Sequence, residues 1–149
     1  MRIQLDYGKD GLVVDLPDSL NAEVLRLNCP PPLPNAASAV ERALDGPIAS
    51  PSLADLARGR KSACVVISDV TRPVPNRLIL PPMLRALEAL GIPRDRVTIL
   101  VGTGLHRPNE GEELAEMVGP EIAGRYRIVN HKARERETHA CLGQTSSGA

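Results

Sequence analysis

Two continuous apolar runs, each followed by a polar turn, constrain the fold of this 149-residue chain more than any other feature. The first run covers residues 62–67 and the second covers residues 97–101. Runs without polar alternation are typical of strands in parallel sheets, where both faces are buried. Between them, apolar side chains at i, i+3 and i+4 spacing predict a helix over residues 75–90. This strand–helix–strand order predicts an α/β fold with a mostly parallel sheet and flanking helices.

Shorter elements are predicted on both sides of this unit. Residues 2–16 alternate apolar and polar side chains around a Gly11 turn, which predicts an N-terminal β-hairpin. The segment Cys29–Asn35 contains four prolines and is expected to be an extended connector. Residues 18–27 are compatible with either strand or helix. The remaining predictions are short helices over residues 36–45, 53–58 and 108–118, and a further strand over residues 125–129.

The domain expected from this pattern is one N-terminal α/β domain over residues 1–149. Within it, residues 1–35 form the hairpin and the Pro-rich connector, and residues 36–149 form the α/β portion. Nothing at the C-terminus resembles a closing element, so we expect the chain to be a fragment of something longer.

Composition excludes several classes of function. Lys plus Arg and Asp plus Glu both number 18, so no net charge attracts nucleic acid or an anionic membrane. Two Tyr, no Phe and no Trp leave almost no platform for stacking single-stranded bases. No apolar run approaches the roughly 18 residues that span a bilayer, and the first residues do not read as a secretion signal. We therefore expect a cytoplasmic protein. Cys64 lies within the first apolar run, and we expect it to be a small core residue.

The turn after the first run, Ser68–Pro75, carries residues suited to anion binding. Hydroxyl and backbone N–H groups near a helix start suit a phosphate or carboxylate. The Arg72 guanidinium offers two parallel donors that match a carboxylate. Asp69 is able to orient that arginine or to bind a ribose hydroxyl, while Thr71 supplies one of the hydroxyl groups. A capped, solvated turn without a ligand is the alternative.

The turn after the second run, Gly102–Pro108, combines glycines with a histidine. Gly102 and Gly104 allow backbone conformations and close approaches that other residues do not. His106 is suited to accept and return a proton near neutral pH. The turn is neither a Walker A loop nor a complete dinucleotide fingerprint. Because parallel strands place their ligand site beyond their carboxyl ends, we expect both turns to build one site.

The other two histidines do not predict a metal centre. His131 follows the strand over residues 125–129, and His139 lies in a charged segment. Their spacing from each other and from His106 matches no local ligand motif. We expect a structural or supporting role for His131, a solvent-exposed His139 and no metal ligand in this chain.

At this point the chain resembles a known family, the lactate racemases and related nickel-pincer-nucleotide-dependent racemases and epimerases of 2-hydroxy acids. The resemblance extends over residues 60–148 and rests on several motifs in family order. These motifs are Ser68–Pro75, Gly102–Pro108, Glu112-Glu113 with Gly119, Asn130-His131 and Leu142–Ser146. Each motif is weak alone, but their order and spacing together are specific.

The resemblance implies that the chain is the N-terminal segment of an isomerase acting on a lactate-like 2-hydroxy acid. In such enzymes a hydride moves to the nickel-pincer nucleotide and returns to the opposite face, while histidines carry the hydroxyl proton. By position, His106 matches an acid/base histidine and Arg72 the residue that binds the substrate carboxylate. Asp69 and Thr71 would lie beside the phosphate or ribose of the cofactor, with Gly102 and Gly104 giving it room.

The resemblance also implies that the chain is part of a larger two-domain enzyme and that its site is incomplete. The family's second catalytic histidine, cofactor-tethering lysine and nickel-binding histidine lie beyond residue 149. We therefore expect the missing C-terminal portion to complete the pocket, and the segment alone to be inactive. A non-catalytic phosphate- or carboxylate-binding α/β module, and a truncated structural domain, are the two alternatives.

Overall fold

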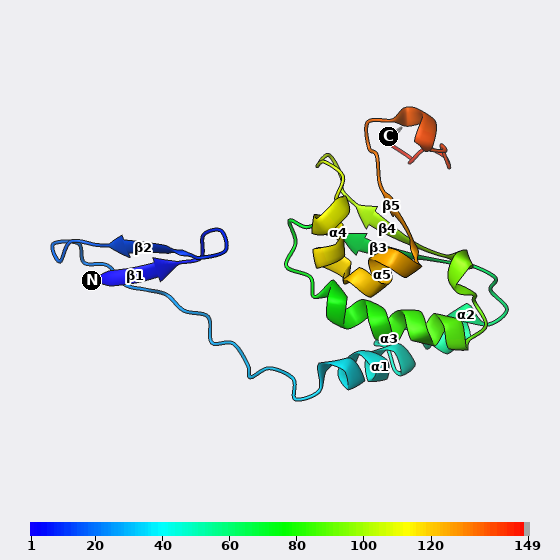
Figure 1. Ribbon diagram of the computed structural model, residues 1–149, viewed down its shortest axis with the longest axis horizontal. Helices are drawn as coiled ribbons and strands as arrows, with labels where there is room; N and C mark the ends of the chain where they lie inside the picture. The colour runs from blue at the N-terminus through cyan, green and yellow to red at the C-terminus, as the bar shows by residue number, and fades with distance from the viewer. Residues whose placement is uncertain (148–149) are drawn as a thin grey trace. The chain divides into compact units, whose positions relative to one another are not determined.

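The computed structural model describes residues 1–147, and the chain divides into two compact units, Met1–Pro32 and Leu33–Ala149. The first unit contains strands β1 (Arg2–Leu5) and β2 (Leu12–Asp15), which pair antiparallel from Arg2↔Asp15 to Leu5↔Leu12 (Figure 1). The predicted N-terminal hairpin is therefore confirmed. After β2, residues 16–35 form neither helix nor strand, which leaves the Pro-rich segment as an extended connector.

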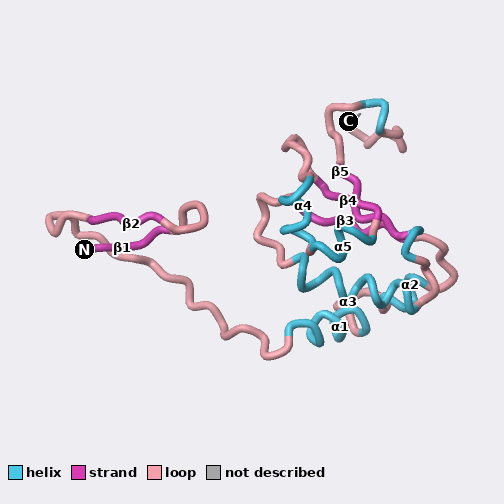
Figure 2. Tube along the Cα trace, in the orientation of Figure 1, coloured by secondary structure: helices cyan, strands magenta, loops and turns pink. Residues whose placement is uncertain are grey.

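The second unit is built on a parallel sheet of three strands, β3 (Ala63–Ser68), β4 (Val97–Gly102) and β5 (Arg127–Asn130), in the order β3-β4-β5 (Figure 2). This confirms the α/β class with a parallel sheet. Ser68 of β3 pairs with Gly102 of β4, and Val101 pairs with Asn130 of β5. The carboxyl ends of all three strands consequently meet at one edge of the sheet.

The helices follow the predicted order. They are α1 (Ala36–Asp45), α2 (Leu53–Ala57), α3 (Asn76–Ala89), α4 (Gly111–Val118) and α5 (Pro120–Arg125), with short 3-10 turns η1 (Arg94–Arg96) and η2 (Arg136–Thr138). The side chain of Ser52 accepts a hydrogen bond from the Asp55 amide at 3.1 Å, which caps α2 as its position predicts. The sequence pattern missed α5, which starts at Pro120 directly after Gly119.

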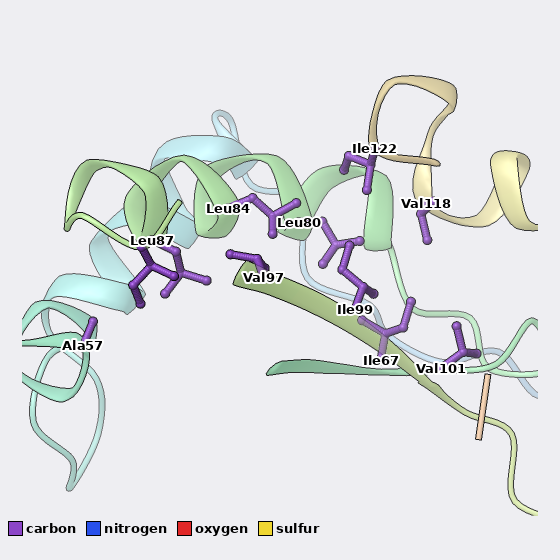
Figure 3. Close-up of a cluster of buried hydrophobic side chains, with 11 residues drawn as sticks. Ala57, Ile67, Leu80, Leu84, Leu87, Val97, Ile99, Val101, Val118 and Ile122 are labelled. Atoms are coloured by element: carbon purple, nitrogen blue, oxygen red, sulfur yellow. The ribbon is translucent and has the colours of Figure 1, made fainter. Parts of the chain in front are cut away.

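One layer of apolar side chains holds this unit together. Leu80, Leu84 and Leu87 of α3 lie over the inward-facing residues of β4 (Figure 3). The buried apolar residues are Ala57, Ile67, Leu80, Leu84, Leu87, Ile92, Val97, Ile99, Val101, Val118 and Ile122. The amphipathic stripe that predicts α3 is thus the stripe that packs on the sheet.

The opposite face of the sheet is open, which corrects one expectation. Cys64 is exposed rather than part of the core, and Val66 beside it is 66% exposed. Successive strand residues point to opposite faces. The buried apolar cluster contains Ile67 from β3, and the side chains of Cys64 and Val66 face the other way. A continuous apolar run therefore does not mean burial on both faces in this chain.

Candidate functional site

The site forms where the turns that follow β3 and β4 come together. Ser68 and Gly102 are the last residues of these strands and are register partners. As a result, the turns that begin at Asp69 and Thr103 leave the sheet side by side. This arrangement brings together residues that are 37 positions apart in the chain, Asp69 and His106.

Asp69 and His106 form a directly bonded pair across these turns. The distance from His106 Nδ1 to Asp69 Oδ2 is 2.5 Å. Asp69 is only 5% exposed, whereas the His106 side chain is 53% exposed. The carboxylate is therefore held inside the turn, and the imidazole extends from it towards solvent.

The other oxygen of Asp69 is held by its own turn. Asp69 Oδ1 accepts a hydrogen bond from the Thr71 hydroxyl at 2.6 Å and from the Thr71 amide at 3.2 Å. These bonds, with the hydrogen bond to His106, lower the pKa of Asp69 below its ordinary value of 3.8. Asp69 is thus a carboxylate near neutral pH, and it fixes the Nδ1–H tautomer of a neutral His106. The Nε2 atom of His106 is then the nitrogen with a free lone pair.

The backbone N–H groups of the first turn already have partners. The Val70 amide donates to Asn109 Oδ1 at 3.2 Å, and the Arg72 amide donates to the Asp69 carbonyl at 3.2 Å. With the Thr71 amide also bonded, this turn presents no row of free N–H groups to an anion. The donors that face outward here are the side chains of Ser68 and Arg72.

Arg72 lies at the same hollow as the Asp69–His106 pair. This hollow has a volume of about 330 Å³ and is lined by Ser68, Asp69, Arg72 and Gly102–His106. Arg72 is exposed, so its guanidinium is accessible to a ligand. The structure therefore places an arginine and a histidine around one space, as the two turn motifs predict.

The two glycines at this hollow serve different geometric needs. Gly104 has a φ of +57°, and a Cβ added there would meet nothing within 4 Å. A side chain at that position would be strained but not crowded, so the space above Gly104 is open. A Cβ on Gly102 would lie 3.4 Å from the Ile67 carbonyl oxygen, in van der Waals contact with the neighbouring strand.

A buried asparagine, Asn109, joins the strand ends by hydrogen bonds. Its role was not expected from the sequence. Asn109 is 1% exposed, and its side chain accepts from the Val70 amide. Asn109 and Asn130 exchange two hydrogen bonds of 2.9 Å between backbone and side chain. Asn109 therefore links the turns after β3 and β4 to the end of β5. Asn109 follows Pro108 and precedes the acidic start of α4, and nothing in this local sequence predicts that its side chain is buried.

Arg107 and Glu113 form a second rigid pair beside Asn109. The guanidinium donates two hydrogen bonds to the carboxylate, at 2.7 and 2.6 Å. Arg107 and the Asn109 side chain lower the pKa of Glu113 to about 2. Since Arg107 is neutralised by this contact, Arg72 is the arginine with its charge directed to the hollow.

The other two histidines lie next to each other, and His131 lines a hollow together with His106. The Thr103 hydroxyl donates to the His131 carbonyl at 2.6 Å, and His131 Nε2 lies 3.0 Å from His139 Nε2. His139 is exposed, as predicted. In residues 1–147, no group of three or more His, Cys, Asp or Glu side chains is arranged to hold a metal ion.

Comparison with known proteins identifies the family. The model of the lactate racemase N-terminal domain family matches residues 7–149. A lactate racemase of Lactiplantibacillus plantarum is 42% identical over 109 residues, which are 73% of this chain and 26% of that protein. A lactate racemase of Thermoanaerobacterium thermosaccharolyticum is 34% identical over 148 residues, which are 98% of this chain and 34% of that protein.

A solved structure gives the same result. The lactate racemase apoprotein from Thermoanaerobacterium thermosaccharolyticum superposes with a TM-score of 0.76 at 34% identity, covering 99% of this chain and 34% of that one. The chain thus spans between a quarter and a third of the length of these relatives. No helix in residues 1–147 is both long and apolar enough to cross a membrane. By sequence and by fold, the chain belongs to the lactate racemase N-terminal domain family.

Proposed function

We propose that this chain supplies one wall of the active site of a racemase or epimerase that acts on a 2-hydroxy acid. The observation that carries the proposal is the contact between Asp69 and His106 at a hollow also lined by Arg72. A 2-hydroxy acid has its carboxylate directly beside the carbon that bears the hydroxyl group. An enzyme that inverts this carbon needs an anion anchor and a proton carrier close together, which is what this hollow offers.

In this proposal each residue has one role. The Arg72 guanidinium binds the substrate carboxylate through paired hydrogen bonds. His106 Nε2 accepts the proton of the substrate hydroxyl and later returns it. Asp69 accepts from His106 Nδ1–H and stabilises the imidazolium that forms, while Thr71 holds Asp69 in place. Asp69 and Thr71 are therefore assigned as positioning residues, because the bonds between them occupy the groups that a nucleotide would otherwise contact.

The cofactor of the proposed reaction is the nickel-pincer nucleotide that the family resemblance implies. When bound, it supplies a reversible acceptor for the hydride of the substrate carbon. The present residues fit part of such a group, because the space above Gly104 is open and Ser68 offers a hydroxyl at the same hollow. Gly102, Gly104 and Ser68 would form its wall on this side. We propose that its tether, its nickel ligand and the second acid/base histidine come from the remaining two-thirds found in the relatives.

A chimera tests this proposal. The chain would replace the matching N-terminal third of the lactate racemase from Thermoanaerobacterium thermosaccharolyticum, to which it is 34% identical. Racemisation of lactate by the cofactor-loaded chimera supports the proposal. In that background, His106→Ala is expected to lower kcat by on the order of 10²- to 10⁴-fold. Arg72→Ala is expected to raise KM more strongly than it lowers kcat.

Two controls decide the outcome. Arg58→Ala, an exposed arginine on the C-terminal side of α2, is the matched control and should leave turnover unchanged. Circular dichroism establishes that each variant is folded. A folded, cofactor-loaded chimera with unchanged turnover after both site substitutions would favour a binding module without catalysis. Racemisation by the 149-residue chain alone would contradict the assignment of an incomplete site.

A further inference from the structure

A pair of histidines outside the proposed active site has the geometry of two metal ligands. His131 follows β5, and His139 follows η2. Their Nε2 atoms are 3.0 Å apart, and their rings meet edge to face with an interplanar angle of 86°. The turn formed by η2 folds the intervening residues back, so two histidines eight positions apart face each other.

The hydrogen bonds around His139 determine which nitrogen is free. His139 Nδ1 lies 2.9 Å from the Glu135 carbonyl oxygen, which can only accept, so Nδ1 carries the hydrogen. In the neutral ring, Nε2 then has its lone pair directed at His131. Metal-bound histidines almost always donate their second ring N–H to a carbonyl or carboxylate in this way, because it fixes the ring and increases its basicity.

The distance between the two nitrogens fits coordination to one ion. Two imidazole nitrogens at about 2.1 Å from a metal are roughly 3.0 Å apart at a right angle and about 3.4 Å apart at a tetrahedral angle. The observed 3.0 Å matches the right-angle case. Right-angle nitrogen ligands are typical of octahedral and square sites, which Ni²⁺ and Cu²⁺ prefer.

The surroundings leave such an ion accessible and only partly coordinated. His131 lies at a hollow of about 350 Å³ between the Gly104–Pro108 turn and residues 131–135, which provides access from solvent. The Glu135 carboxylate on this segment is engaged by Lys132 at 2.9 Å. A bound ion would therefore have two protein ligands and would keep its other positions for water or an oxygen ligand.

We propose that His131 and His139 bind a divalent transition metal of the nickel–copper type, at a site that uses neither Asp69 nor His106 as a ligand. The ion takes the place of the hydrogen between the two Nε2 atoms, and that hydrogen moves to Nδ1 of His131, so both imidazoles bind in their neutral form with no net release of a proton. The site does not depend on the proposed racemase function. The short loop containing η2 closes the chelate.

Titration of the chain with NiCl₂, followed by isothermal calorimetry at pH 7.5, tests the proposal. We expect one Ni²⁺ per chain, with affinity at least tenfold lower in His131→Gln and in His139→Gln. His106→Gln is the matched control and should change the affinity by less than twofold. No saturable binding to the unmodified chain would overturn the proposal, and so would unchanged affinity in His139→Gln.

Paramagnetic broadening by Ni²⁺ in NMR spectra locates the ion even where a variant fails to fold. In the unmodified chain, the imidazole signals of His131 and His139 should broaden at substoichiometric Ni²⁺, before those of His106. Earlier broadening of His106 would place the ion at the Asp69–His106 pair and would overturn the proposal.

Discussion

Asp69 is a buried side chain that carries a charge. Burial alone would raise the pKa of a carboxyl group, but hydrogen bonds from Thr71 and His106 outweigh it and lower the pKa of Asp69. The largest influence is the Thr71 hydroxyl, followed by His106. A threonine two positions along the turn thus maintains the charge that orients the histidine.

Replacing Thr71 by valine tests this dependence at the residue scale. Thr71→Val removes the hydroxyl donor but keeps the shape of the side chain, so the pKa of Asp69 should rise. Carboxyl ¹³C NMR over a pH titration measures it. Thr98→Val on β4 is the matched control, and the pKa of Asp69 should not change in that variant. An unchanged pKa in Thr71→Val would show that the hydroxyl does not stabilise the carboxylate.

At the scale of elements, β4 is the strand on which both core and site depend. Val97, Ile99 and Val101 are fully buried against the helices, and the turn after Gly102 carries the histidine. Strand β3 contributes the other turn but has one face in solvent, so it contains both buried and exposed apolar residues. Identical substitutions on these two strands should therefore have different costs.

The substitutions Val101→Ala and Val66→Ala compare these environments directly. Val101→Ala removes a fully buried side chain and should lower the free energy of unfolding by roughly 1.5–3 kcal/mol. Val66→Ala removes a side chain that is 66% exposed and should change it by less than about 0.5 kcal/mol. Urea denaturation followed by circular dichroism measures both. Equal losses would mean that the outer face of β3 is covered in solution.

At the scale of the whole molecule, two ion pairs, each between residues six positions apart, lower the pKa of a carboxyl group. Arg94 in η1 contacts Glu88 of α3 at 2.8 Å, and the Tyr126 hydroxyl donates to the same carboxylate at 2.6 Å. These contacts lower the pKa of Glu88 to about 2. The Arg107–Glu113 pair has the same effect on Glu113. Both carboxyl groups therefore bind protons more weakly in the folded chain than in the unfolded one.

This difference sets the direction of the acid response. Because the folded pKa values are depressed, the stabilisation is fully present above the ordinary pKa of 4.5 and is lost as the pH falls towards 2. Urea midpoints should stay nearly constant from pH 7 to about 5 and then fall. Glu88→Gln and Glu113→Gln should each flatten that decline, whereas Asp45→Asn, an exposed control on α1, should not. A decline of equal slope in all variants would rule out these pairs as its source.

The features that could be predicted from the sequence are those that depend on local patterns of apolar and polar residues. Apolar periodicity identified β3, α3 and β4, and the polar turns placed Arg72 and His106 at one edge, because carboxyl ends of parallel strands coincide. Local patterns say little about what covers a strand. Cys64 was therefore wrongly expected in the core, since an apolar run does not reveal whether a second layer packs on it.

Residue order along the chain thus determined the α/β class, the order of the strands and of the longer helices, and the two turns that meet at one edge of the sheet. Only the tertiary structure decided how the site residues pair: Asp69 lies against His106 rather than beside Arg72, and Asn109 is buried as the link between three strand ends. The contact between His131 and His139 likewise depends on how the η2 turn folds back. The physical reason is that hydrogen bonds between turns depend on strand register and side-chain direction, which no local sequence pattern encodes.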